Sequence, residues 1–318
     1  MRLGSITTNL LNLPPVEGLR LLRELGISDI EVACGGFFDD RAYGDPQRLL
    51  SDPEELARWR ERLANAEIAI SAIAVHGAPL SPHADLAQSH TRDYILACRL
   101  AEAVGVTRLT LLAGLPEANP GDSEPTWLVA ADPESNADRW NWQWEERVLP
   151  YWRKHAPIAE QHGCRLCLEM APSDFAHNPR GLLMLRAELG PVIGCNFDPS
   201  HLWWQGIDPL AALRHLGPAV YHAHAKDIEI RPEAAINGTL DARSPAAPEQ
   251  RAWNFRTAGY GHDEEFWASY INTLQEIGYD DVLSIEHEDV TVSGDQGLRD
   301  AVSFLTPLIA AANQTRPG

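Results

Sequence analysis

Cysteine is scarce in this sequence, and the five cysteines that it has are scattered over 318 residues. An odd, scattered set argues against a disulfide framework and is typical of reduced thiols, so we expect a cytoplasmic location. Cys164 and Cys167 form a C-x-x-C motif. The motif leads into a strand-like run rather than opening a helix, where a redox thiol would be activated. We therefore do not expect a redox role.

Basic residues are also in the minority, with 26 lysines and arginines against 45 aspartates and glutamates and a net charge of −19. An acidic surface repels phosphate backbones, which argues against nucleic acid as a partner. No stretch approaches the roughly 20 apolar residues that span a bilayer. The first residues, MRLGSITTNLLNLPP, lack the charged start, apolar block and cleavage site of a signal peptide. We expect a protein that binds neither nucleic acid nor membrane.

What the sequence does contain is a regular alternation of amphipathic segments and short apolar runs. Many amphipathic segments end at glycine, which enters the left-handed backbone region at low cost and so terminates helices. Six glycines precede apolar runs in this way: Gly26, Gly105, Gly163, Gly190, Gly217 and Gly278. With RLGSIT at the start and IAISAIAVHG at 68–77, the pattern predicts eight strands. Helices are predicted over 19–25, 53–66, 91–104, 179–189, 208–216, 263–277 and 297–312.

Strict alternation of strands and helices predicts a parallel sheet, and eight units predict an α/β fold with one (β/α)8 TIM barrel over residues 1–318. An open, doubly wound sheet is the alternative, but SITTNLLNLPP is not the Gly-rich phosphate loop that such a sheet carries after its first strand. Two insertions enlarge the connections after strands 4 and 7, at 114–150 and 228–258. In a barrel both lie on the catalytic face.

Half of the ten tryptophans lie in or beside the first insertion: Trp127, Trp140, Trp142, Trp144 and Trp152. They either form a small core that holds the insertion in place or line a pocket in which the apolar face of a sugar stacks on an aromatic ring.

Four segments of the second half each end in a potential metal ligand. LCLEMAP, CNFDPSHL, HAHAKD and LSIEHED offer Glu169, Asp198, His224 and Glu286. This mixed oxygen–nitrogen set suits Mn²⁺, Mg²⁺ or Co²⁺ better than a structural zinc. Strand-end carboxylates also cap neighbouring helices. However, the first three ligands follow one another at about 30 residues, the length of one βα unit, as a ring of ligands around a barrel mouth requires.

The two glutamates also suggest a reaction. Glu169 and Glu286 follow the fifth and eighth strands, so each could move a proton on one side of a substrate while the metal stabilises an enediolate. His222 and His224 share one strand face, and we expect one of them to be the ligand and the other to lie deeper. Four further residues are predicted to bind substrate: His201, Arg256, His76 and Lys226. For Lys226 a salt bridge to a metal carboxylate is the alternative, for Arg256 a surface position and for His76 a core position.

The quoted motifs, together with NFDPSHLWWQGIDP and GYGHDEEFW, resemble the xylose-isomerase-like barrel superfamily of sugar phosphate isomerases and epimerases. The resemblance implies that Glu169, Asp198, His224 and Glu286 bind a divalent metal, often Mn²⁺, that the two glutamates act as acid and base, and that His201 contacts the substrate. The two insertions are similar to those of the branch with C-glycoside deglycosidase large subunits and 3-keto-glycoside lyases.

Three functions are compatible with this site. The leading hypothesis is a metal-dependent isomerase or epimerase that acts on a sugar or keto-sugar. A lyase that cleaves 3-keto-glycosides by β-elimination begins with the same proton abstraction and is the alternative. A sugar-binding barrel without turnover is the third. A homo-oligomer or a complex with a small partner subunit is compatible with all three.

Overall fold

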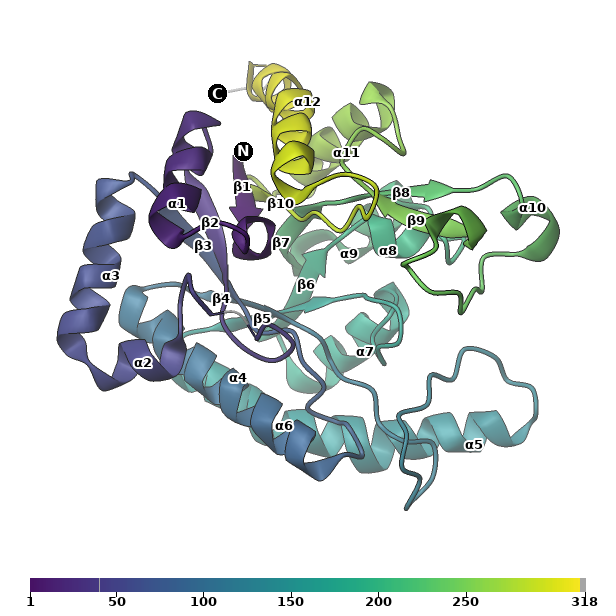
Figure 1. Cartoon of the computed structure of the whole chain (residues 1–318). Helices are drawn as coiled ribbons and strands as arrows, with labels where there is room; N and C mark the ends of the chain where they lie inside the picture. Colours follow the sequence, from purple (N-terminus) through teal and green to yellow (C-terminus); the bar gives the residue numbers. More distant parts are fainter. Residues whose placement is uncertain (40, 315–318) are drawn as a thin grey trace. The chain divides into compact units, whose positions relative to one another are not determined.

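The computed structural model describes residues 1–39 and 41–314. Eight parallel strands form one closed barrel in the order β1–β10–β7–β6–β5–β4–β3–β2, and Figure 1 labels these elements. The strands are β1 Arg2–Ile6, β2 Asp29–Ala33, β3 Ala69–Ala74, β4 Arg108–Leu111, β5 Arg165–Glu169, β6 Ile193–Phe197, β7 Val220–Ala225 and β10 Val282–Ile285. The predicted (β/α)8 barrel is therefore confirmed.

The strands are short apolar runs because parallel strands in a barrel are covered on both faces. β2 and β6 are buried at every position. Glu31 in β2 and Glu169 at the end of β5 are exceptions to the apolar pattern. Because a carboxylate is almost never fully buried unless it is paired, both positions call for partners inside the barrel.

Seven helices correspond to the predicted ones. They are α1 Pro15–Glu24, α3 Pro53–Asn65, α4 Ala84–Val104, α7 Pro179–Leu189, α9 Pro209–Leu216, α11 Glu264–Glu276 and α12 Gly294–Gln314. Side-chain caps begin several of them: Asn178 accepts from the Gly181 N–H at the start of α7, and Asp263 accepts from the Phe266 N–H at the start of α11. Among the described helices, none is long and apolar enough to cross a membrane.

Both insertions contain regular structure that the sequence pattern did not predict. In the first, α5 (Ser135–Trp142) continues through a π-helical turn (Gln143–Val148) into α6 (Leu149–Gln161). The second holds an antiparallel pair, β8 (Asp227–Ile230) and β9 (Trp253–Arg256), and the short helix α10 (Ala234–Asn237). We call this second insertion the arm. Five shorter elements of the described chain also escaped prediction: α2 Pro46–Ser51, α8 Ser200–Trp203 and the 3-10 turns Thr7–Leu10, Gly217–Ala219 and Pro248–Gln250.

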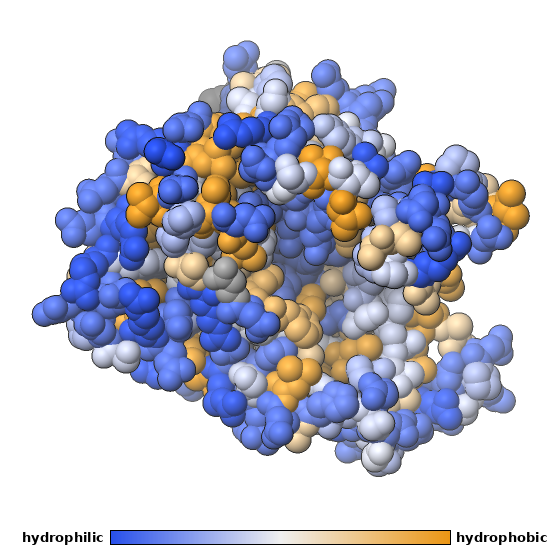
Figure 2. All heavy atoms as spheres, in the orientation of Figure 1, coloured by the Kyte–Doolittle hydropathy of each residue, from blue (hydrophilic) through white to orange (hydrophobic). Residues whose placement is uncertain are grey.

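The chain groups into two compact units. The first comprises Met1–Glu31, Glu61–Ser71 and Phe197–Gly318, and the second comprises Val32–Arg60 and Ala72–Asn196. In the first, α11 packs against α12, and in the second α6 packs against α4 and α7. The face drawn in Figure 2 is mostly hydrophilic, in keeping with the acidic composition.

One buried carboxylate fastens the arm to the following loop in the first unit. Asp227 Oδ2 accepts hydrogen bonds from the backbone N–H groups of Gly259, Gly261 and His262 and from the indole of Trp267. Its Oδ1 contacts His262 Nδ1 at 2.7 Å. A Cβ on Gly261 would lie 2.0 Å from the Ile228 carbonyl oxygen, so the loop can approach this closely only with glycine.

We predict that Asp227→Ala lowers the free energy of unfolding by about 3 kcal/mol, because four donors, among them the buried indole of Trp267, lose their acceptor at once. Asp227→Asn should lie between this variant and the wild type. Urea denaturation followed by near-UV circular dichroism measures the change. The exposed Asp138→Ala is the control, and a loss in Asp227→Ala no larger than in this control would contradict the assignment.

Candidate active site

Three of the predicted metal ligands lie together in the first unit, and we call Asp198, His224 and Glu286 the His224 cluster. His224 is fully buried in β7, Asp198 follows β6, and Glu286 follows β10. His224 Nδ1 lies 3.2 Å from Glu286 Oε2 and 3.8 Å from Asp198 Oδ2. One ligand atom from each of the three lies within 4.8 Å of the others. Two carboxylate oxygens and one imidazole nitrogen therefore converge, as a divalent cation requires.

Lys226 lies beside this cluster, two residues beyond His224 on the same face of the chain. Its ammonium is 3.1 Å from Asp198 Oδ2, 2.6 Å from Glu286 Oε2 and 2.8 Å from Glu288 Oε2. The side chain is almost fully buried. Both alternatives for Lys226 thus stay open, because a lysine paired with these carboxylates also lies where negative charge would develop on a substrate.

His201 on α8 borders the same group. Its Nε2 lies 3.6 Å from Asp198 Oδ2 and 3.4 Å from Lys226 Nζ. The imidazole packs edge-on against the ring of Phe255, which comes from the arm. The structure therefore brings His201 and Lys226, two of the four predicted substrate-binding residues, to the His224 cluster.

A further carboxylate, Glu31 on the other side of His224, escaped sequence reasoning. Glu31 Oε2 lies 2.9 Å from His224 Nε2 and 3.0 Å from His222 Nε2, and it accepts a 3.0 Å hydrogen bond from Ser284 Oγ. His222 is thus the deeper histidine of the pair, whereas His224 has its Nδ1 on the side of Asp198 and Glu286. The available signal was a charged residue inside the apolar run DIEVA.

The pKa shifts of His224 and Glu31 follow from their burial and from the charges beside them. Burial alone would lower the pKa of His224, but the carboxylates of Glu31 and Glu286 raise it well above its ordinary value. Burial would likewise raise the pKa of Glu31, but His224 and His222 lower it well below its ordinary value. Glu31 is therefore an ionised carboxylate that fixes which nitrogen of His224 is directed to the cluster.

The second unit holds the remaining glutamate. Glu169 is the last residue of β5 and is buried. Its Oε2 accepts a 2.7 Å hydrogen bond from Asn196 Nδ2 and lies 3.2 Å from His76 Nε2. Glu169 is opposite Asn196 in the register of β5 and β6, and Asn196 precedes Asp198 by two residues in the chain. His76, predicted to bind substrate, thus contacts a predicted catalytic residue.

Arg256 is engaged elsewhere. Its guanidinium lies 3.1 Å from Glu229 Oε2 and 3.1 Å from Asp289 Oδ2, both in the first unit. It lines a cavity of about 410 Å³ together with Glu229 and Tyr260, and no residue of the His224 cluster lines that cavity. The prediction that Arg256 binds substrate therefore gains no support from its described contacts.

Asp174 joins the loops that follow β4 and β5 in the second unit. It accepts hydrogen bonds from the Gly114 N–H at 2.7 Å and from the Ala176 N–H at 2.8 Å. Burial raises the pKa of this carboxyl to about 7 despite these bonds, and the negative charge of Glu169 contributes to the rise. Between about pH 4 and pH 7, Asp174 is therefore mostly neutral in the folded chain, whereas the same side chain is ionised in the unfolded chain.

We predict that Asp174 makes the protein less stable as the pH rises. Because its pKa is raised in the folded state, the contribution of Asp174 to the free energy of unfolding is complete below about pH 4 and is lost by about pH 7. The unfolding free energy of the wild type should therefore fall between about pH 5 and pH 7.5 by on the order of 1 to 3 kcal/mol more than that of Asp174→Asn. Urea titrations at the two pH values measure this difference, and parallel pH profiles for both proteins would refute it.

Comparison with known proteins agrees with the barrel fold. The sequence pattern of the xylose isomerase-like TIM barrel family matches residues 19–308. The chain is 34% identical over 314 residues to the uncharacterized protein YfiH of Bacillus subtilis (strain 168), which covers 98% of this chain and 100% of that protein.

Solved structures share the fold at lower identity. An L-ribulose 3-epimerase superposes with a TM-score of 0.64 at 18% identity, covering 98% of this chain and 96% of the other. A xylose isomerase-like TIM barrel protein from Mycobacterium smegmatis in complex with magnesium superposes with a TM-score of 0.63 at 17% identity, covering 98% and 97%.

Proposed function

Because the chain belongs to the xylose isomerase-like TIM barrel family, we propose that it is a divalent-metal-dependent isomerase or epimerase of a sugar or keto-sugar. The observation that carries the proposal is the His224 cluster, in which two carboxylates and a buried imidazole converge. Fold alone would not support a reaction, since barrels of one type serve many chemistries.

In this proposal Glu169 is the fourth ligand. The carboxyl ends of all strands in a parallel barrel meet at one rim, where active sites of such barrels lie. Glu169 ends β5, Asp198 follows β6, His224 is the fifth residue of β7, and Glu286 follows β10. The register of Glu169 with Asn196, two residues before Asp198, favours the same grouping.

The donor set fits a hard or borderline divalent cation. Three carboxylates and one imidazole suit Mn²⁺, Mg²⁺ or Co²⁺, and we favour Mn²⁺. The similar Mycobacterium smegmatis structure contains magnesium. When bound, such an ion supplies positive charge next to the substrate oxygens and so stabilises negative charge that develops there.

The protein's own groups then move the protons. One of the two glutamates, Glu169 or Glu286, takes the proton from the carbon next to the carbonyl, and the other returns a proton to complete the isomerisation or epimerisation. His76 and Asn196 contact Glu169 and hold its carboxylate in one orientation. Lys226 does the same for Glu286 and adds positive charge beside the reacting oxygen.

His201 and Lys226 lie beside Asp198 of the His224 cluster. In this proposal their side chains bind the hydroxyl or carbonyl oxygens of the substrate. An L-ribulose 3-epimerase with the same fold supports a free sugar as the substrate class. The described residues around the cluster are rich in carboxylates, which would repel a phosphorylated sugar.

We predict that EDTA abolishes turnover and that Mn²⁺ restores it. In D₂O, the metal-loaded protein should incorporate one deuteron into the product carbon without loss of any group, as followed by NMR on a panel of ketoses and keto-sugars.

Glu169→Gln and Glu286→Gln should each lower kcat at least about 100-fold, since each removes a proton-transferring group.

Three outcomes would change this assignment. Release of a free aglycone from a 3-keto-glycoside would favour the lyase. Sugar binding that survives Glu169→Gln, with no substrate converted, would favour a binding barrel. Undiminished turnover in metal-free protein would refute the metal role altogether.

A separate prediction concerns Glu31. Glu31→Gln should weaken Mn²⁺ binding by about 10- to 100-fold, because the neutral amide no longer holds His224 with its Nδ1 toward the cluster. Isothermal titration calorimetry with Mn²⁺ measures the change. The exposed Glu233→Gln is the matched control, and equal affinities in the two variants would contradict a positioning role for Glu31.

A further inference from the structure

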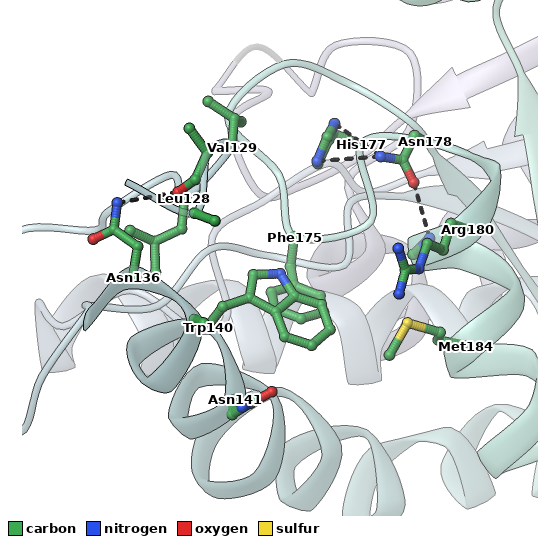
Figure 3. A pocket seen from close by; sticks show the side chains of 14 residues that line it. Leu128, Val129, Asn136, Trp140, Asn141, Phe175, His177, Asn178, Arg180 and Met184 are labelled. Atoms are coloured by element: carbon green, nitrogen blue, oxygen red, sulfur yellow. Dashed lines mark hydrogen bonds between the residues drawn. The ribbon is translucent and has the colours of Figure 1, made fainter. Parts of the chain in front are cut away.

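A second cavity lies entirely within the second unit. It has a volume of about 540 Å³ and is bordered by the segment 128–131, by α5 and by the loop from β5 to α7 with the first turns of α7. Figure 3 shows Leu128 and Val129 at one end, Asn178 and Arg180 at the other, and Trp140 with Phe175 between them. This volume is within the range of pockets that bind small organic molecules.

The middle of the cavity is a rigid aromatic surface. The rings of Trp140 and Phe175 stack with centroids 5.2 Å apart and planes at 26°. Trp144 stacks on both, at 6.5 Å and 5.8 Å. Because each ring is held by the other two, the surface exists before a ligand arrives, and a flat ring can stack on it at little cost in ordering.

The two ends differ in polarity. Leu128 and Val129 make one end apolar, and Val129 is 48% exposed, whereas Met184 lies beside Arg180. At the other end Arg180 is exposed, and among the described residues none is paired with its guanidinium. No acidic residue is among those that line this described cavity, although the whole chain carries a net charge of −19.

From this combination we infer that the cavity is a binding site for a flat, apolar ring that carries a carboxylate, such as an aromatic acid. The ring stacks on Trp140 and Phe175 and contacts the apolar end, while the carboxylate pairs with Arg180. The amide of Asn178 already caps α7 by accepting from Gly181, so the helix end adds only its partial positive charge. A hydroxyl-rich sugar acid would leave the apolar end uncovered.

The test uses 2-naphthoate as the probe, with its neutral counterpart 2-naphthalenemethanol and with glucuronate for comparison. Binding is measured by isothermal titration calorimetry and saturation-transfer NMR on the full-length protein in EDTA, so the result does not depend on the reaction proposed above. We expect 2-naphthoate to bind at least about tenfold more tightly than the alcohol and glucuronate to bind no better than the alcohol.

Variants locate the binding within the cavity. Arg180→Gln should remove the preference for the acid, and Trp140→Ala should weaken 2-naphthoate by about tenfold. Val129→Asp changes an exposed side chain at the apolar end, so it should weaken 2-naphthoate binding by placing a charged carboxylate against the apolar ring, without affecting folding. Trp142→Ala on the same helix and Arg153→Gln on α6 change residues outside the lining and should leave affinity unchanged.

Several results would overturn the inference. One is the absence of 2-naphthoate binding. Another is that glucuronate or the alcohol binds more tightly than 2-naphthoate. The third is that both Arg180→Gln and Val129→Asp bind 2-naphthoate with the affinity of the wild type.

Discussion

Buried negative charge is the constraint on which the candidate active site depends. Glu31 is fully buried in the first unit, where it contacts His222, His224 and Ser284 through a single carboxylate oxygen. Without these partners the carboxylate could not remain ionised at such depth. With them, it sets the orientation of His224, and this orientation in turn places an imidazole nitrogen beside Asp198 and Glu286. The geometry of the site is therefore determined one layer below the residues that would meet a substrate.

The barrel and its order of elements follow from local physical chemistry and were predictable. Helices that end at glycine and short, largely apolar strands need only neighbours along the chain, as in the run RAELG-PVIGCNF. The period of two likewise places His222, His224 and Lys226 on one face of the chain. The grouping of Asp198, His224 and Glu286 followed from the same reasoning, since each lies at or near a strand end.

What escaped prediction depends on contacts between distant segments. Glu31 lies almost 200 residues before His222, and only the pairing of β2, β1 and β10 brings Glu31 near Ser284. The arm was expected to be a loop because its proline, alanine and arginine residues carry no alternating pattern. Its strands are held instead by pairing with each other. Arg256 turns to Glu229, which the β8–β9 register places within reach, and to Asp289, which follows β10.

Asp227 has a consequence for how such a barrel can diversify. It follows Lys226 directly, so the face that carries His222, His224 and Lys226 and the start of the arm are separated by one peptide bond. The side chain of Asp227, at the start of the arm, accepts hydrogen bonds from the loop at 259–262, which follows the end of the arm. These bonds hold the two ends of the arm together. Residues between these ends other than Phe255, which contacts His201 and Lys226, can therefore change in number and type while the base of the arm stays fixed. The arm is in this sense a variable segment that a single carboxylate anchors at its base, and Phe255 is the position through which it contacts the candidate site.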